Sequence, residues 1–145
     1  MKKVFLIIIS LIGVLSGCLN PTSVRVVEDM YTKALLEDSD AVATYFSEEM
    51  LLERSAEELT EELAAHPRHV GGIPLLNATE LTRNRLNPEI VEELDATYDE
   101  KWHFIVNDAA EGEVMTWIVI KTPSQYEIVA GEQITNTHYQ QHILK

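Results

Sequence analysis

Cysteine, basic residues and glycine are all scarce in this chain of 145 residues. The single cysteine, Cys18, has no partner for a disulfide within the molecule. Lys and Arg number 11 against 24 Asp and Glu, so the formal net charge is −13. Such a surface repels nucleic acid and anionic lipid headgroups, which argues against nucleic-acid binding and phosphate binding. The glycines form no phosphate-binding loop, and the chain has no internal repeat.

One long apolar run is present, and it lies at the N-terminus. Lys2 and Lys3 precede a mostly apolar segment from Val4 to Leu15, which is the order of charges and apolar residues in a secretory signal peptide. The segment is shorter than the roughly 20 residues that a membrane-spanning helix needs. We therefore expect residues 1–17 to be a signal peptide that is cleaved on export.

The residues around Cys18 explain why an exported chain would keep one cysteine. Leu15-Ser16-Gly17-Cys18 resembles the lipobox of bacterial lipoproteins, in which the cysteine thiol receives a diacylglyceryl group and small neighbours admit the peptidase. This resemblance implies that Cys18 is lipidated, incorporates palmitate, and anchors the protein to the extracytoplasmic side of the cell membrane. The alternative is an uncleaved N-terminal membrane anchor that contains an incidental cysteine.

The mature chain is long enough for one domain. Cleavage after residue 17 would leave 128 residues and, with Lys2 and Lys3 removed, a net charge of −15. We expect residues 18–22 to be the lipidated cysteine and a short tether, and residues 23–145 to form a single domain. A domain of this length buries about two-thirds of the surface that its unfolded chain exposes.

Helical periodicity characterises the first half of the mature chain. From a cap at Ser23, apolar residues recur at the spacing of one helix face, namely Val24, Val27, Tyr31, Ala34 and Leu35. A short second helix is expected from Asp40. Ser55 and Glu58 form a capping box for a further helix, which we expect to end before Pro67 because proline cannot donate a helical hydrogen bond.

Strand patterns follow Gly71-Gly72, and turn residues separate them. We expect four strands, at residues 73–82, 97–107, 113–122 and 124–134. We interpret residues 84–95, with the breaker Asn87-Pro88, as a loop with one helical turn at most. Helices followed by a meander of strands indicate an α+β fold, with two or three N-terminal helices packed on a curved antiparallel sheet of about four strands.

This layout resembles small bacterial lipoproteins with a cystatin-like or nuclear-transport-factor-2-like domain. The residues that carry the resemblance are Val27, Tyr31, Ala34, Leu35, Ser39-Asp40 and Gly71-Gly72-Ile73. It covers most of the mature chain and includes no invariant catalytic motif, and the insert at 84–95 departs from the pattern. Such folds include ketone isomerases, dehydratases, binding modules and subunit-contact domains, so the resemblance implies a fold and leaves the function open.

The sequence contains no recognisable catalytic motif. It has neither a Ser-His-Asp arrangement nor a candidate cysteine nucleophile. His138 and His142 are four residues apart and would share a face if the tail were helical, as paired metal ligands do, but no Glu follows His138. We expect a polar tail there, place His66 and His69 on a loop around Pro67, and assign neither a metal nor a cofactor.

Two functions from different classes remain. The leading prediction is a non-enzymatic binding or interaction module of the cell envelope, with its partner unknown. The alternative is a small-molecule-binding or catalytic cone between helices and sheet. The residues expected to line that cone are Tyr31, Tyr45, Phe46, Trp102 and Phe104.

The central strands carry large apolar residues on both faces, whereas a sheet with one solvated face should alternate apolar and polar residues. Either the segment 84–95 and the C-terminal tail cover the second face, or that face is a contact surface. In the second case the surface would bind another copy of the chain or an envelope protein. The residues that would form it are Met115, Trp117 and Val119.

Overall fold

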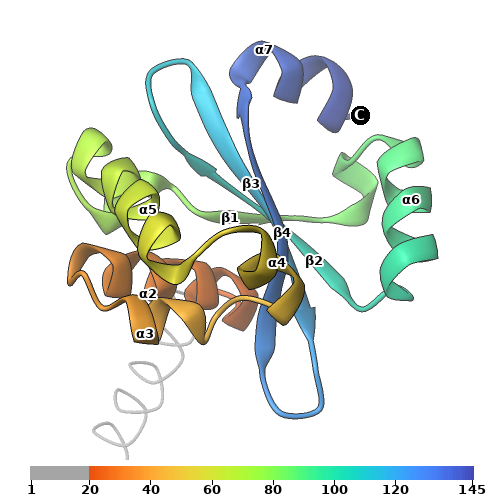
Figure 1. Ribbon diagram of the computed structural model, residues 1–145. Helices are drawn as coiled ribbons and strands as arrows, with labels where there is room; N and C mark the ends of the chain where they lie inside the picture. Colours follow the sequence, from red (N-terminus) through yellow and green to blue (C-terminus); the bar gives the residue numbers. More distant parts are fainter. Residues whose placement is uncertain (1–19) are drawn as a thin grey trace, which may run out of the picture.

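Four antiparallel strands form one open sheet in the order in which they occur along the chain (Figure 1). The computed structural model describes residues 20–145, so the predicted signal peptide and Cys18 lie outside the described residues. The α+β class and the four-stranded antiparallel sheet are confirmed. The strands are β1 (Thr79–Leu81), β2 (Trp102–Asp108), β3 (Glu113–Lys121) and β4 (Tyr126–Thr135).

Two hairpins join the long strands at the predicted turns. Asp108 pairs with Val114 at the end of β2 and the start of β3, and Lys121 pairs with Tyr126 across the next turn. The register of β3 and β4 shifts between Ile118 and Val119, which marks a β-bulge. The predicted first strand is wrong over most of its length, because residues 73–76 form the 3₁₀ turn η1 and β1 is three residues long.

Between residue 20 and the sheet lie four α-helices, and polar side chains cap three of them. The helices are α2 (Thr22–Leu35), α3 (Ser39–Ala43), α4 (Glu48–Glu53) and α5 (Ala56–Val70). Asp38 caps α3 and Ser47 caps α4 through their side-chain oxygens. The predicted capping box of Ser55 and Glu58 is confirmed at the start of α5.

Two predicted helix boundaries are wrong. Ser23 lies inside α2 and does not cap it; its hydroxyl instead donates to Glu80 Oε2 at 2.6 Å. Helix α5 continues through Pro67 to Val70, where Gly71, with φ of 97°, ends it in the left-handed conformation. Pro67 cannot donate a helical hydrogen bond, but its carbonyl oxygen accepts hydrogen bonds from Gly71 N and Gly72 N, which close the last turn.

The segment predicted as a loop between the first two strands contains the helix α6 (Pro88–Tyr98). Asn87 caps it by accepting a hydrogen bond from Glu89 N, and Pro88 occupies the first turn. Proline favours that position because the first helical N–H groups have no intrahelical partner. The Asn87-Pro88 pair therefore begins a helix. Strand β2 starts only after this helix ends, at Trp102.

The C-terminal tail is helical. The short helix α7 (Asn136–His138) continues directly into a π-helical turn, η3 (Tyr139–Ile143). Asn87 N donates to Ile143 O at 2.8 Å, and Lys145 N donates to Arg85 O at 3.0 Å. These bonds hold the tail against the segment that precedes α6.

Helices cover both faces of the sheet (Figure 1). Helices α2, α3 and α5 pack on the face that carries Ile105, Trp117 and Val119, and this cluster includes Val27 and Leu63 from the helices. On the opposite face, α6 and the C-terminal segment pack against a second apolar cluster. The buried members of that cluster are Leu81, Leu86, Trp102, Phe104, Val106, Val114, Ile118, Ile134 and Tyr139.

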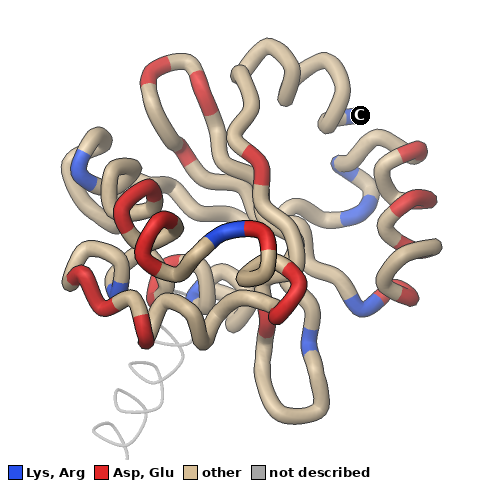
Figure 2. Tube along the Cα trace, viewed as in Figure 1, with Lys and Arg blue, Asp and Glu red and all other residues tan. Residues whose placement is uncertain are grey.

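Acidic side chains are spread over the outer surface of these layers. Asp and Glu occur along α4, α5 and α6 and at the tip of the β2–β3 hairpin, whereas Lys and Arg are few and scattered (Figure 2). Within residues 20–145, no helix combines the length and hydrophobicity needed to cross a membrane.

Candidate functional site

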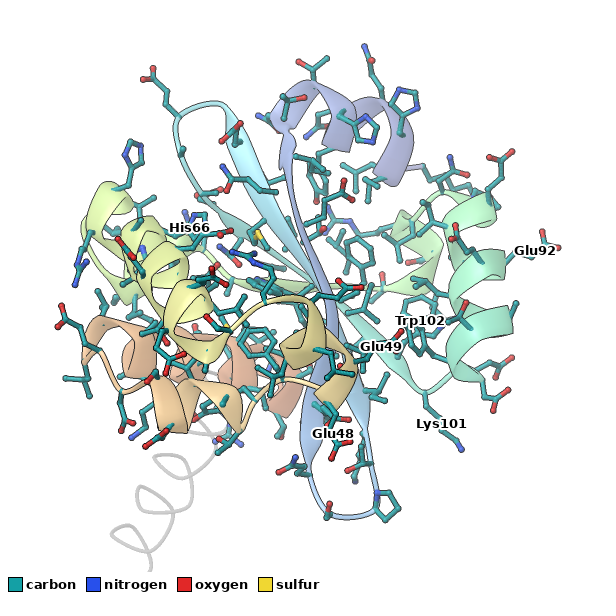
Figure 3. The ribbon with its side chains drawn as sticks, viewed as in Figure 1. Glu48, Glu49, His66, Glu92, Lys101 and Trp102 are labelled. Carbon is teal, nitrogen blue, oxygen red and sulfur yellow. The ribbon has the colours of Figure 1, made fainter. Side chains whose placement is uncertain are left out.

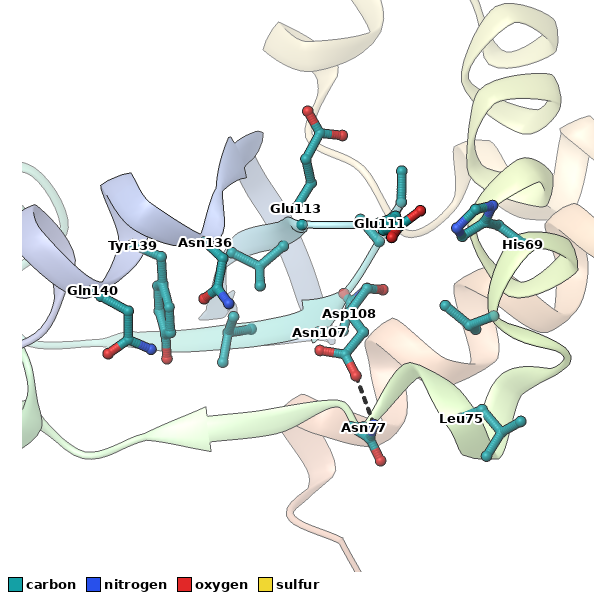
Figure 4. A pocket seen from close by; sticks show the side chains of 16 residues that line it. His69, Leu75, Asn77, Asn107, Asp108, Glu111, Glu113, Asn136, Tyr139 and Gln140 are labelled. Carbon is teal, nitrogen blue, oxygen red and sulfur yellow. Dashed lines mark hydrogen bonds between the residues drawn. The ribbon is translucent and has the colours of Figure 1, made fainter.

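A polar groove of about 710 Å³ lies beside the β2–β3 hairpin (Figure 4). Its walls come from three parts of the chain: the end of α5 with η1, the hairpin itself, and the start of the C-terminal helical segment. Sequence positions near 70, 110 and 138 therefore meet at one place, which the order of the chain alone does not indicate.

The lining of the groove is acidic. Asp108, Glu111 and Glu113 come from the hairpin, and His69 faces them from α5 (Figure 4). Of the 16 lining residues, none is Lys or Arg. The groove therefore combines three carboxylates with the amide groups of Asn77, Asn107, Asn136 and Gln140 and the phenol of Tyr139.

Hydrogen bonds hold two of these carboxylates in place. Asn77 Nδ2 donates to Asp108 Oδ2 at 2.6 Å, and the amide of Gln133 donates to Glu113. Asn136 N donates to Gly112 O at 2.8 Å and ties the C-terminal helix to the hairpin loop. Because Gly112 has a φ of 76°, this loop uses a conformation in which glycine is favoured.

The floor of the groove connects to the helix-covered core through Asn107. Its side chain is buried, and its Oδ1 accepts a hydrogen bond from Trp117 Nε1 at 2.9 Å. The Tyr31 hydroxyl lies 3.2 Å from Asn107 Nδ2, and Nδ2 also donates to Asp108 O at 2.8 Å. Burial raises the pKa of Tyr31 well above its usual value, so its hydroxyl stays protonated at neutral pH.

His66 is a buried residue of α5 beside the same core (Figure 3). Its ring meets the ring of Tyr31 edge-on, with 6.0 Å between centroids, and it is 6 % exposed. Within the described chain its Nε2 has no hydrogen-bond partner. Burial lowers the pKa of His66, against the opposing influence of Glu62 and Glu113. The prediction that His66 and His69 lie on a loop is wrong, because α5 continues through Pro67 to Val70 and includes both.

The five residues predicted to line one cone lie on opposite faces of the sheet. Tyr31, Tyr45 and Phe46 belong to the core under the N-terminal helices. Trp102 and Phe104 belong to the other core, where Trp102 Nε1 donates to Asp95 Oδ1 at 2.9 Å (Figure 3). The predicted cone is therefore wrong, because the N-terminal helices pack on one face of the sheet and the side chains of Trp102 and Phe104 lie on the other.

The predicted contact surface is also wrong. Met115, Trp117 and Val119 are 6 %, 2 % and 0 % exposed, because helices α2 and α5 cover this face. The alternative, that the chain covers both faces itself, is confirmed. The segment 84–95 and the tail do cover one face, but it is the face of Trp102 and Phe104.

Sequence reasoning missed the groove. The turn between the predicted strands 97–107 and 113–122 is present, but its sequence does not indicate a groove beside it. Nothing local in the sequence indicates that Asn77 and Asn136 lie beside this turn. The one available signal was the density of carboxylates, Asp108, Glu111 and Glu113, within a single hairpin.

Within residues 20–145, no group of three or more His, Cys, Asp or Glu side chains is arranged to hold a metal ion. The resemblance to lipoproteins of the cystatin-like or nuclear-transport-factor-2-like type stays a prediction. No protein-family model matches the chain, and neither a curated protein nor a solved structure matches it.

Proposed function

We propose that this protein is a lipid-anchored, extracytoplasmic binding module that takes a cationic group of a partner into the groove beside the β2–β3 hairpin. The observation that carries the proposal is the composition of the groove: three carboxylates and several amides line it, and no Lys or Arg neutralises them from within the lining. A concave surface lined by one sign of charge attracts and orients the opposite charge.

The arrangement of the titratable groups supports binding over catalysis. Tyr31 and His66, whose pKa values are shifted by burial, lie in the helix-covered core and are not among the residues that line the groove. Active sites characteristically combine a cavity with groups of perturbed pKa. Tyr139 does line the groove, and burial raises its pKa, so its phenol stays protonated at neutral pH and serves as a hydrogen-bonding group and not as an evident acid or base.

The chemistry of the lining indicates the kind of partner group. Ammonium and guanidinium groups supply the hydrogen-bond donors that carboxylate and amide oxygens accept. Asp108 and Glu111 are exposed, so the groove is open to solvent and suits a side chain presented by a peptide or protein. A lipid anchor at Cys18 would hold this surface close to the membrane, where other envelope proteins are concentrated.

A binding measurement on the full-length protein tests the proposal. Fluorescence anisotropy would compare a Lys- and Arg-rich peptide with a Glu-rich peptide of equal length. We expect the basic peptide alone to bind, with an affinity that falls as salt rises. The double variant Glu111→Gln and Glu113→Gln should weaken binding by roughly 0.2–1 kcal/mol for each lost ion pair.

A matched control separates the groove from general acidity. Glu49→Gln with Glu92→Gln makes the same change in net charge at exposed positions on α4 and α6, away from the groove (Figure 3). If both double variants weaken the basic peptide equally, the attraction is a property of the whole surface and the proposed site is wrong.

A further inference from the structure

His138 and His142 are brought together by the helical tail. Both side chains are exposed, and their ring centroids are 4.6 Å apart with the ring planes inclined by 33°. We propose that the two imidazoles form a site for a divalent transition-metal cation of the Cu²⁺, Ni²⁺ or Zn²⁺ type. This site is separate from the acidic groove and does not depend on the function proposed for it.

The backbone of both histidines is fixed by contacts to the rest of the domain. His138 N donates to the Thr135 side-chain oxygen at 3.2 Å, and the Asn87 side chain donates to His142 O at 3.2 Å. Between the two histidines, Tyr139 is 8 % exposed and packs in the core on this face of the sheet. Ligands on a fixed backbone lose less conformational entropy when they bind, which favours affinity.

The local helix geometry is itself unusual. Leu144 N donates to Tyr139 O at 3.1 Å, five residues back, so the turn that contains His142 is π-helical. Such turns are rare and frequently occur at functional sites. Here the turn keeps Tyr139 buried while both imidazoles stay on the outer surface, 4.6 Å apart between centroids.

The ligand class follows from the donor atoms. Imidazole nitrogen suits Cu²⁺, Ni²⁺ and Zn²⁺, and divalent affinity for such a site increases along the first transition series to copper. Because no cluster of three potential ligands occurs within residues 20–145, water would complete the coordination shell. The net charge of −13 raises the local concentration of any cation.

The test uses the full-length, detergent-solubilised protein purified without a histidine tag. Isothermal titration with CuCl₂, NiCl₂ and ZnCl₂ should show one saturable site per chain, tightest for Cu²⁺. His138→Ala and His142→Ala should each weaken Cu²⁺ binding by at least about tenfold, which corresponds to about 1.4 kcal/mol. Both positions are exposed, so circular dichroism should show the fold of the variants unchanged.

Two controls make the outcome specific. His69→Ala removes an exposed histidine from the acidic groove and should leave Cu²⁺ binding unchanged. Gln140→His combined with His142→Gln keeps two histidines in the tail, at positions 138 and 140. Residues two positions apart do not face each other on a helix. That variant should bind as weakly as His142→Ala.

Three outcomes would overturn the proposal: absence of saturable Cu²⁺ binding by the wild type, unchanged affinity in either alanine variant, or an equal loss of affinity in His69→Ala.

Discussion

At the scale of single residues, Gly131 and Trp117 show how closely the sheet is packed. The two residues are partners across β3 and β4, and the Trp117 indole occupies the space that a side chain at position 131 would fill. An aromatic ring over a glycine on an edge strand is a recognised way to fill the gap that a glycine leaves. Trp117 also donates to Asn107, so its ring position is fixed from two directions.

Gly131→Ala should therefore destabilise the protein although Gly131 itself is exposed. A Cβ atom there would lie 2.3 Å from Trp117 Cζ3, and Trp117 is 2 % exposed and not free to move away. We expect a loss of about 1–3 kcal/mol in the free energy of unfolding, measured by urea denaturation. In a Trp117→Phe background the same substitution should cost less, since neighbouring residues couple. Equal costs in both backgrounds would show that the ring contact is not the cause.

At the scale of elements, α5 differs most from its predicted form. The continuation of α5 through Pro67 places His66 in the core next to Tyr31, where its Nε2 has no hydrogen-bond partner among residues 20–145. Pro67 predicted an earlier helix end because proline disrupts helices in their interior. In the last turn the disruption is small, since the helix ends at Gly71 in any case.

This burial predicts a pH-dependent stability. The pKa of folded His66 is below its usual 6.5, so folding favours the neutral ring. The contribution of His66 to stability is present above pH 6.5 and is lost as the pH falls toward the lower pKa of the folded state. The unfolding free energy of the wild type relative to His66→Leu should therefore fall between pH 7.5 and pH 5.5.

Urea denaturation at both pH values measures this difference. The charged and titratable groups around His66 are Glu62, Glu113 and His69, and all three remain in both proteins. His69→Leu on the exposed face of the same helix serves as the surface control. A difference between wild type and His66→Leu that stays constant with pH, or that grows as the pH falls, would contradict the assignment of His66 as a buried neutral ring.

At the scale of the whole molecule, the domain is closed on both sides of its sheet and acidic on its outer surface. Neither of its two apolar clusters leaves a sheet face for a partner, so binding is left to surface grooves and exposed side chains. The lipid anchor and the signal peptide remain predictions, because they involve residues outside 20–145. A lipid anchor at Cys18 would determine where the groove and the histidine pair act.

Replacing Cys18 tests the anchor. Cys18→Ser should abolish palmitate incorporation and leave the precursor unprocessed, because serine lacks the thiol that accepts the diacylglyceryl group. The wild type should label with palmitate and partition into the detergent phase. Ser16→Ala keeps a small residue beside the cleavage site and should be processed as the wild type is. Unlabelled wild-type protein, free in the medium as its major form, would contradict lipidation.

The sequence by itself determined the features that depend on neighbouring residues. The alternation along β2 and β3 defined which side chains share a face, and the turn residues located both hairpins. The Ser55–Glu58 capping box located the start of α5, because the two residues of the box are only three positions apart and act on the first turn of the helix. The same local rules placed Asn87-Pro88 at a boundary but did not distinguish a loop from the helix that begins there.

Only the tertiary structure decided which helices pack on which face of the sheet and where the groove forms. Both faces of β3 carry large apolar residues, so the strand's alternating pattern is consistent with the N-terminal helices on either face of the sheet. The groove and the tail contacts join residues far apart in the chain, as Asn77 with Asp108 and Asn87 with His142 do. Such contacts arise from the packing of whole elements, and the energy that selects them is spread over two cores and is not encoded in any short segment of the sequence.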